Sequence, residues 1–527
     1  MNTAEFLTIS AAIVPDRVAI AGPEEHLTFG ELRTRANKVA QAFQKMGVGR
    51  GQAVGVMAVN CVEYAEIYYG AAAVGATLVP LNFRAKPEEL TYMIDSTDVT
   101  VLFIAERYYS IYESIVASVP TVKHVISLDF EKAGVPTLAA LRDAEEDIPV
   151  YTDTDDKDPT IIIFTSGTTS LPKGVVLSYQ ALTSLVVNTQ APADPSIKQQ
   201  VVLVSVPFYH IAGATTLMST VFSGRRLVVL PSFDPQGWLA AVEKEGVTHT
   251  FVVPTMLKRI MEVDDFDRYN LNSLELVTYG AAPMPYEVVR KAVDVFAPDK
   301  ANVGLMNSYG QTEATGSMST LGPDDHRMDG TPEENEKKLL RLRSVGRPMT
   351  DIDVAIMFPD GRMAPMNEEG EICIRGARVM SSYNKREDDT ESALKDGWLH
   401  TGDVGKIDDG GYLFITGRIK DMVIRGGENI APAEIEQVLE DHPFVAEAAI
   451  IGVPDVEWGE VCKAIMVPVD KGTLPSEQEL TEYVKSRIAS YKAPAFYQWV
   501  DELPRNPLGK VLKNELRDKY GAPTPVA

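Results

Sequence analysis

Short apolar runs alternate with amphipathic helical stretches over the first quarter of the chain, and this alternation constrains the fold more than any other feature. A helix is predicted over residues 28–46, followed by an apolar run from Val54. The same order recurs as LVPLNF before a helix from Pro87, as VTVLFIA before a helix near Tyr109, and as HVISL. Strands that alternate with helices favour parallel sheets covered on both faces. The sequence therefore predicts an α/β protein with doubly wound layers.

Chain length and a later change of pattern divide the sequence. The 527 residues exceed what one hydrophobic core supports, so at least two domains are expected. From residue 344 to about 417, short strands are separated by turn signals such as Asp408-Asp409-Gly410, which favours a small β-barrel-like subdomain. After residue 419 a charged, Gly-rich stretch precedes a helix over 431–439. We expect a large N-terminal domain of residues 1–419 and a small α+β domain of residues 420–527.

Composition limits the partners. The formal net charge of −24 repels nucleic acid, so an anionic substrate needs a local cluster of donors. The three cysteines, Cys61, Cys373 and Cys462, show no metal-ligand spacing, which favours a reduced cytoplasm, and Cys373 is expected as a buried strand thiol. The N-terminus lacks a signal-peptide pattern. The apolar region 201–222 is interrupted by Pro207 and His210, so we expect buried strand and loop in a soluble protein without a transmembrane segment.

The sequence TSGTTSLPKG, residues 165–174, follows the apolar strand 161–164. Small residues let backbone N–H groups point inward, hydroxyls add donors, and Lys173 supplies the positive charge that phosphates require. The spacing excludes a P-loop, because Pro172 precedes the lysine and Gly174 follows it. An ordinary Ser/Thr/Gly surface loop is the alternative, but ten residues in this order favour a phosphate-binding loop.

This loop resembles the phosphate-binding signature of the adenylate-forming (ANL) superfamily, which includes acyl-CoA synthetases, luciferases and the adenylation domains of peptide synthetases. Further signatures of that superfamily follow in the same order: YGQTE at 309–313, TGD at 401–403, Gly417-Arg418, and PRNPLGK at 504–510. The chain departs from the pattern at Ser170, where the family usually has a glycine that accepts positive φ freely. The resemblance implies an enzyme that uses ATP and Mg²⁺ to activate a carboxylic acid.

The resemblance also implies roles for individual residues. Tyr309 packs on adenine, Asp403 accepts the ribose hydroxyls, and Arg418 closes over the nucleotide. Lys510 neutralises the charge that builds up between the α-phosphate and the attacking carboxylate. The implied catalytic residues are Lys510, Lys173, Thr165, Glu313 and His210, with Thr165 and Glu313 as metal ligands. The implied ATP/AMP residues are Thr165, Ser166, Gly167, Thr168, Thr169, Lys173, Gly280, Ala281, Ala282, Asn307, Ser308, Tyr309, Gly310, Gln311, Thr312, Asp403, Arg418 and Lys510.

Two further segments resemble those of CoA ligases. GEICIRG at 370–376 is similar to a motif of 4-coumarate-CoA ligases, and IRGGENIAPAEIE from residue 424 is similar to the small-domain signature of acyl- and aryl-CoA ligases. Coenzyme A is therefore the implied acceptor, with a mobile small domain that pivots at Lys420. Arg84, Gly426, Gly427 and Glu428 are the implied CoA residues.

The family's acyl pocket corresponds here to PFYHIAG at 207–213 and neighbouring elements. His210 is either a gate at the carboxylate end or an ordinary core histidine. The implied pocket residues are His210, Ile211, Gly213, Phe251, Gly280, Gly310 and Ala314. Their small, apolar character predicts a medium- or long-chain fatty acid, or an aromatic or alicyclic acid. Alternatives are a carrier-protein acceptor, a luciferase-like monooxygenase and a catalytically silent scaffold, and a homodimer is compatible with the family.

Overall fold

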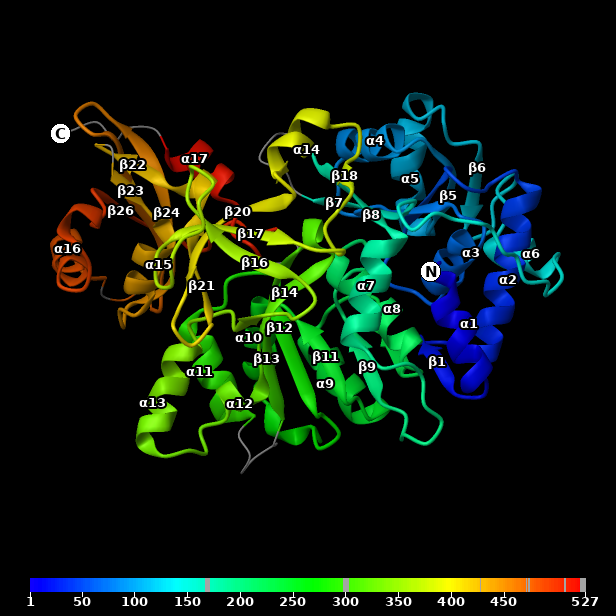
Figure 1. Cartoon of the computed structure of the whole chain (residues 1–527), viewed down its shortest axis with the longest axis horizontal. Coiled ribbons are helices and arrows are strands. Elements are labelled where there is room, and N and C mark those ends of the chain that lie inside the picture. Colours follow the sequence, from blue (N-terminus) through cyan, green and yellow to red (C-terminus); the bar gives the residue numbers. More distant parts are fainter. Residues whose placement is uncertain are drawn as a thin grey trace.

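The computed structural model describes residues 1–165, 171–296, 303–426, 428–470, 472, 474–506 and 509–521, apart from the side chain of Asn429. Within these residues, two mainly parallel sheets with helices packed against them form the large N-terminal part (Figure 1). The predicted α/β class with doubly wound layers is confirmed.

The first sheet forms the central part of the molecule. Its strands are β1 (Val18–Ala21), β2 (His26–Thr28), β9 (Val201–Val204), β10 (Arg226–Val229), β11 (His249–Val252), β12 (Leu276–Gly280), β13 (Gly304–Gln311), β14 (Gly316–Leu321) and β15 (Arg347–Pro348). They run in the order β15-β14-β13-β12-β11-β9-β10-β1-β2, and neighbours from β13 to β1 are parallel. Parallel strands end at one edge of a sheet, and β12 and β13 therefore deliver their terminal residues to the same place.

The second sheet carries the predicted phosphate-binding loop. Its strands are β3 (Ala53–Met57), β4 (Thr77–Pro80), β5 (Val99–Ile104), β6 (His124–Ser127), β7 (Pro159–Thr165), β8 (Lys173–Ser178) and β18 (Ser382–Tyr383). Their order is β18-β8-β7-β4-β3-β5-β6. Because β18 pairs with β8, a segment two hundred residues further along the chain lies beside Lys173.

Helices pack against both sheets. They are α1 (Ala4–Ile13), α2 (Phe29–Lys45), α3 (Glu63–Ala73), α4 (Pro87–Ser96), α5 (Glu106–Ile115), α6 (Leu138–Asp143), α7 (Tyr179–Thr189), α8 (Ile211–Phe222), α9 (Pro235–Glu245), α10 (Pro254–Met261), α11 (Tyr286–Val295), α12 (Pro323–His326) and α13 (Pro332–Arg341). Helix α2 is the helix predicted at 28–46. It begins at a capping box, because the Thr28 hydroxyl accepts from the Glu31 N–H at 3.2 Å and the Glu31 carboxylate accepts from the Thr28 N–H at 2.8 Å.

The expectation of strand and loop over 201–222 is wrong for its second half, where α8 forms. Ile211, Ala214, Met218 and Val221 are buried on one face of this helix. These apolar residues have the spacing of a helix, but the Ser, Thr and Gly residues between them made the segment resemble a loop. No helix in the described ranges is long and apolar enough to cross a membrane.

The β subdomain packs beside the first sheet (Figure 1). Its strands are β16 (Asp353–Met357), β17 (Gly370–Arg375), β19 (Leu394–Lys395), β20 (Trp398–Ile407) and β21 (Leu413–Arg418), and the short α14 (Glu387–Ala393) precedes β19. Glu371 pairs with Val404 but Cys373 pairs with His400, so β20 bulges between His400 and Val404. Cys373 is a buried strand thiol, as expected.

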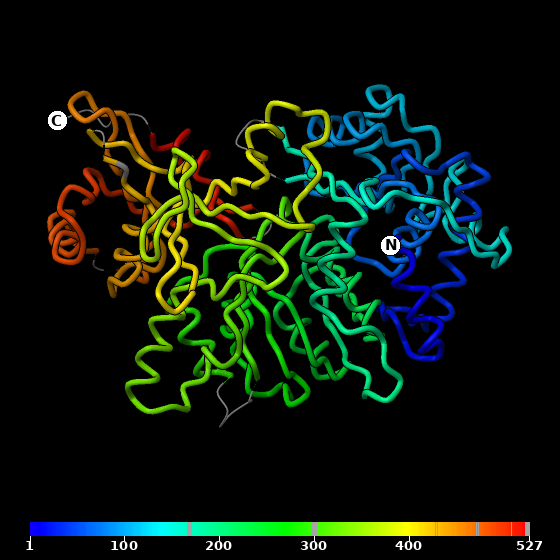
Figure 2. The backbone as a smooth tube through the Cα atoms, viewed as in Figure 1, coloured from blue at the N-terminus to red at the C-terminus, as the bar shows by residue number. Residues whose placement is uncertain are grey.

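The small domain has its own apolar cores, one on each face of its sheet. It contains β22 (Val423–Arg425), β23 (Glu428–Ile430), β24 (Val445–Asp455), β25 (Gly459–Pro468), β26 (Phe496–Trp499), α15 (Pro432–Glu440), α16 (Glu477–Lys485) and α17 (Lys513–Tyr520). Figure 2 shows it as the orange and red part of the tube. Ion pairs join it to the large domain, Arg343 to Asp441 at 3.6 Å and Lys258 to Glu447 at 4.0 Å. The predicted boundary near residue 420 stays a prediction.

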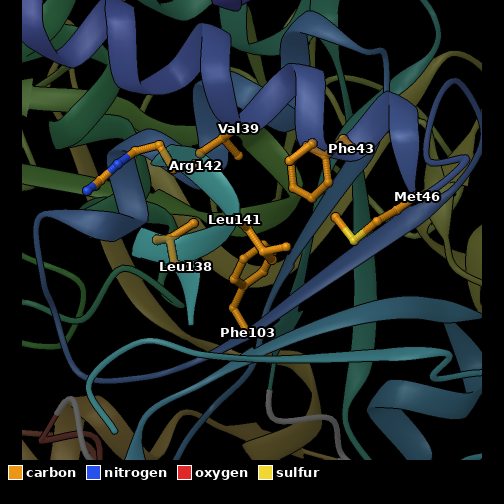
Figure 3. Close-up of a pocket in the computed structure, with 8 residues that line it drawn as sticks. Val39, Phe43, Met46, Phe103, Leu138, Leu141 and Arg142 are labelled. Carbon is orange, nitrogen blue, oxygen red and sulfur yellow. The ribbon is translucent and has the colours of Figure 1, made fainter. Parts of the chain in front are cut away.

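A narrow apolar crevice, too small to hold a water molecule, lies between α2, α6 and β5 (Figure 3). Its lining residues are Val39, Ala42, Phe43, Met46, Phe103, Leu138, Leu141 and Arg142. It contains none of the residues predicted for the acyl pocket, so we regard it as part of the packing between α2 and the second sheet.

Candidate active site

The ends of the predicted phosphate-binding loop meet in a β hairpin. Thr165 ends β7 and pairs with Lys173, the first residue of β8, and the Thr165 hydroxyl donates to the Lys173 carbonyl oxygen at 3.4 Å. The two ends are therefore held in register. The predicted site residues Ser166, Gly167, Thr168 and Thr169, and the departure at Ser170, lie outside the described residues, as does Gly427.

Lys173 and Glu313 contact the same side chain, Tyr383 of β18. The Lys173 ammonium lies 4.9 Å from the centre of the Tyr383 ring, and the Tyr383 hydroxyl donates to Glu313 Oε1 at 2.8 Å. Lys173 also forms an ion pair with Asp389 of α14, whose other carboxylate oxygen accepts from Arg386 Nη1 at 3.2 Å. Burial and the adjacent Glu313 carboxylate raise the pKa of the Tyr383 phenol. A cation and a carboxylate predicted for phosphate and metal binding thus lie together.

The end of β12 approaches β13, and the end of β13 approaches β14, too closely for a side chain at the glycine. A Cβ on Gly280 would lie 2.0 Å from the Ser308 carbonyl oxygen, and a Cβ on Gly310 would lie 1.9 Å from the Gly316 carbonyl oxygen. Ala281 follows with a φ of +67°, a conformation that side chains rarely adopt. The glycines are therefore required by packing, and they leave this strand edge free of bulk.

Asp403 is the centre of a charged cluster. Its side chain is 7% exposed and accepts hydrogen bonds from the Tyr309 hydroxyl at 2.7 Å and from Arg418 Nε at 2.5 Å. Asp403 lies in the β20 bulge, next to Gly402, which has a φ of +72°. Burial and the Asp403 carboxylate raise the pKa of Tyr309, which therefore stays a neutral hydrogen-bond donor. Three residues from distant motifs thus form one contact network.

Lys510 of the small domain lies within electrostatic range of this network. Its backbone N–H donates to the Asn506 side chain at 2.9 Å, and Gly509 lies so close to α10 that a Cβ there would be 2.6 Å from the Thr255 hydroxyl. Burial and the neighbouring Arg418 and Lys420 cations lower the pKa of Lys510 to about 8, with Asp403 and Asp421 opposing them. The predicted catalytic lysine therefore lies in the field of Asp403 and Arg418.

The predicted CoA segment is elsewhere. Gly426 donates its N–H to the Trp458 carbonyl oxygen at 2.7 Å, and Arg425 donates to the Tyr491 carbonyl oxygen at 2.7 Å, all within the small domain. Glu428 is exposed on β23. Gly509, next to Lys510, thus packs on the large domain, whereas these described contacts of Arg425 and Gly426 lie within the small domain.

His210 caps α8. Its Nδ1 accepts from the Ala212 N–H at 3.3 Å, so the ring proton is on Nε2, and burial lowers the pKa of His210 to about 4.

The residues around His210 are closely packed, and a Cβ on Gly213 would lie 2.3 Å from the Pro207 carbonyl oxygen. The adjacent Tyr209 packs edge-on against Phe83 at 5.2 Å, and Arg84 lies over that ring at 5.7 Å. Arg84, the predicted CoA-contacting arginine, is therefore connected through the Phe83 ring to Tyr209, the residue before His210.

The remaining predicted residues lie on β11, β13, the start of α8 and the segments that follow β12 and β13. Gln311 is notable because its Nε2 is buried without a hydrogen-bond partner among the described residues, which leaves a donor for a ligand. Asn307 donates to the Ser344 carbonyl oxygen at 3.4 Å, and the Ser308 hydroxyl lies 2.5 Å from that of Ser317. The other predicted residues are the buried Ile211, Thr312 and Ala314 and the half-buried Phe251 and Ala282. Their ligand contacts stay predictions.

Sequence reasoning missed Tyr383, Asp389 and Thr255. Tyr383 lies in a two-residue strand and Asp389 in an acidic run, EDD, typical of a solvated helix start. Thr255 faces Gly509 only because the small domain lies over α10. None of the three had a local signal, since each contact depends on distant segments.

Comparisons with known proteins agree with this geometry. A family model described as AMP-binding enzyme matches residues 7–384, and a model of the AMP-binding enzyme C-terminal domain matches residues 434–510. The chain is 32% identical over 512 residues to a feruloyl-CoA synthase from an Amycolatopsis species, with 97% of each chain covered. It is also 32% identical over 527 residues to the long-chain-fatty-acid–CoA ligase FadD13 of Mycobacterium tuberculosis, with 99% of each covered. Among solved structures, the amide bond synthetase McbA from Marinactinospora thermotolerans superposes with a TM-score of 0.86 at 27% identity, covering 98% of this chain and 100% of that chain.

Proposed function

Since this chain belongs to the AMP-binding enzyme family, we propose that it is an AMP-forming acyl-CoA synthetase. It joins a carboxylic acid to AMP with release of diphosphate from ATP, and then transfers the acyl group to the thiol of coenzyme A. The observation that carries the proposal is the packing of Gly509 on Thr255 of the large domain, with the adjacent Lys510 in the electrostatic field of Asp403 and Arg418, because a cation is needed where charge develops in the first step.

The nucleoside is bound between the strand ends and the β subdomain. Asp403 accepts the ribose hydroxyls, and Arg418, already paired with it, closes over the nucleotide. The Tyr309 ring packs on adenine, and the close approach at Gly280 keeps the strand edge flat enough for a planar base. These roles extend the hydrogen bonds that the residues make in the free protein.

The phosphates are bound at Lys173. Its ammonium leaves Asp389 for the triphosphate, and the Ser/Thr/Gly segment between β7 and β8 supplies further donors. Glu313 and Thr165 supply hard oxygen ligands, which fit Mg²⁺. The ion would neutralise phosphate charge when bound, and Tyr383 would keep the Glu313 carboxylate oriented through its hydroxyl.

The acid is a medium- or long-chain fatty acid or an aromatic or alicyclic acid. The relatives named for ferulate and for long-chain fatty acids support this range. His210 is neutral above about pH 5, so it places a neutral Nε2–H donor at the carboxylate end and adds no second positive charge. The reacting carboxylate attacks the α-phosphate, and Lys510 balances the negative charge of both groups.

The second half-reaction needs a different orientation of the small domain. Rotation about Lys420 would remove Lys510 and bring Gly426 and Glu428 to the large domain, where CoA would pass Arg84. The orientation in this structure suits the first half-reaction, because Gly509 packs on Thr255 while Gly426 packs on Trp458.

The remaining expectations belong to the same proposal. A role in fatty acid metabolism follows from the substrate range. A cytoplasmic location is supported by Cys61, Cys373 and Cys462, which are free thiols. A homodimer is also proposed, and size-exclusion chromatography with light scattering measures it directly.

The test follows diphosphate release from Mg-ATP with a panel of acids, with and without CoA, beside Lys510→Ala. We expect acid-dependent release and a CoA thioester, both strongly reduced in the variant. The variant should still convert a synthetic acyl-adenylate and CoA to the thioester, because that step does not use Lys510. Release without a thioester would favour another acceptor, such as a carrier protein, and absence of both across the panel would contradict the proposal.

A further inference from the structure

Three potential metal ligands lie together in the β subdomain, outside the predicted ATP, acyl and CoA residues. Glu371 and Cys373 are two residues apart on β17, so their side chains point to the same face. His400 of β20 is the register partner of Cys373. One carboxylate oxygen, one sulfur and one ring nitrogen therefore come to within 4.8 Å of one another on neighbouring strands.

The distances suit a small divalent ion. In a tetrahedral site with bonds of about 2.0–2.3 Å, ligand atoms lie about 3.3–3.6 Å apart. The separation of Cys373 Sγ from His400 Nδ1 is already 3.5 Å. The separation of His400 Nδ1 from Glu371 Oε2 is 2.6 Å, so these side chains must move apart by about 0.7 Å.

The burial of the three ligand side chains would let a metal ion enter the site from one side only. The Cys373 side chain is fully buried and packs with Ala355, Met357 and Trp398, which cover the site on the side of the thiol. The side chains of Glu371 and His400 are 20% and 23% exposed, so water reaches the cluster between them. Three protein ligands with one open position make a complete site with a water as the fourth ligand.

We propose that Glu371, Cys373 and His400 bind one divalent ion of the zinc class, with a water completing a tetrahedron. Thiolate and imidazole ligands favour Zn²⁺, Co²⁺ or Cd²⁺ over Mg²⁺. The ion replaces the proton shared by His400 Nδ1 and Glu371 Oε2, His400 keeps a proton on Nε2, and the thiol proton leaves to solvent. The site is therefore separate in position and chemistry from the oxygen ligands proposed for Mg²⁺.

This site is coupled to Asp403 through the β20 bulge. Glu371 Oε1 accepts from the Gly402 N–H at 3.0 Å, and His400 lies at the start of the bulge that presents Asp403. Moving Glu371 and His400 apart therefore shifts Gly402 and the carboxylate beside it. We infer that occupancy inhibits use of the nucleotide, and this second statement, unlike the binding itself, rests on the proposed function.

Metal binding is tested on the chelator-treated full chain with Co²⁺ as the probe. We expect one equivalent to produce a near-ultraviolet thiolate-to-cobalt band that Zn²⁺ abolishes. The band should be absent in Cys373→Ser and much weaker in His400→Ala. Cys462→Ser, which alters another buried strand thiol in the small domain, should retain it. A wild-type chain without the band, or a band retained by Cys373→Ser, would overturn the site.

The coupling is tested by diphosphate release in Mg-ATP with added Zn²⁺. Zn²⁺ should slow the wild-type chain, with reversal by a chelator, and leave Cys373→Ser unaffected. Circular dichroism and the unfolding temperature check that the variants are folded, and His400→Ala provides a second test if the serine variant is not. Equal inhibition of wild type and variants would overturn the coupling, while the spectroscopic result does not depend on the proposed function.

Discussion

Replacing Asp389 by asparagine should tighten ATP binding, although the residue belongs to none of the motifs. The Asp389 carboxylate is paired with Lys173, and this hydrogen bond lowers the pKa of Asp389, so the group is ionised at assay pH. A triphosphate must separate the ammonium from this carboxylate and then bind near a negative charge. An asparagine side chain at this position removes both costs while keeping the size of the native side chain.

The magnitude follows from the exposure of the pair. The side chains of Lys173 and Asp389 are 16% and 31% exposed, so solvent screens their attraction, and the ion pair contributes about 1 kcal/mol. One kcal/mol corresponds to a factor of about five in affinity. We expect Asp389→Asn to lower the KM for ATP about fivefold in initial-rate diphosphate release, with a smaller gain at high salt because ions screen the pair further.

The matched control is Asp388→Asn, an exposed neighbour on α14. It changes the net charge equally and should leave the KM for ATP nearly unchanged. A rise in KM for Asp389→Asn, in the direction expected for Lys173→Ala, would refute the reasoning, because Asp389 would then orient Lys173 rather than compete for it.

Three further changes have defined outcomes. Because the pKa of Lys510 is about 8 and its ammonium is the active form, kcat/KM for ATP should be constant below that pH and fall above it, and Lys510→Arg should move the fall upward. Gly280→Ala places a Cβ 2.0 Å from the Ser308 carbonyl oxygen and should lower the free energy of unfolding by about 3 kcal/mol in denaturant titration. Tyr309→Phe removes a hydrogen bond to the buried Asp403 carboxylate and should lower the free energy of unfolding by about 1.5 kcal/mol in the same measurement.

Much of the fold and the family could be predicted because the signals are local. The capping box at Thr28 marks the start of α2, and the comparisons confirm the family and ligase class expected from the motifs between residues 165 and 510. Lys510 is predicted as catalytic from its motif, and in the structure it lies in the electrostatic field of Asp403 and Arg418, while its catalytic role stays a prediction.

The rest depends on contacts between distant segments. Asp389 reaches Lys173 only because β18 pairs with β8, and no pattern within α14 indicates that pairing. The Glu371, Cys373 and His400 cluster was missed because ligand spacing was sought within one segment, whereas register across two strands creates it. The choice of acid depends on pocket depth, which one side chain changes by about 1–3 kcal/mol per methylene.

The ion pairs between the domains contribute little to holding the orientation seen in this structure. Arg343–Asp441 and Lys258–Glu447 have side chains between 24% and 42% exposed, so together they hold the small domain by only about 1 kcal/mol. That corresponds to a population ratio of about five, which the differential affinity of one bound ligand can reverse. For the rotation proposed about Lys420, these two ion pairs are therefore a weak restraint, and the reactants bound at each stage would decide which face of the small domain is in use.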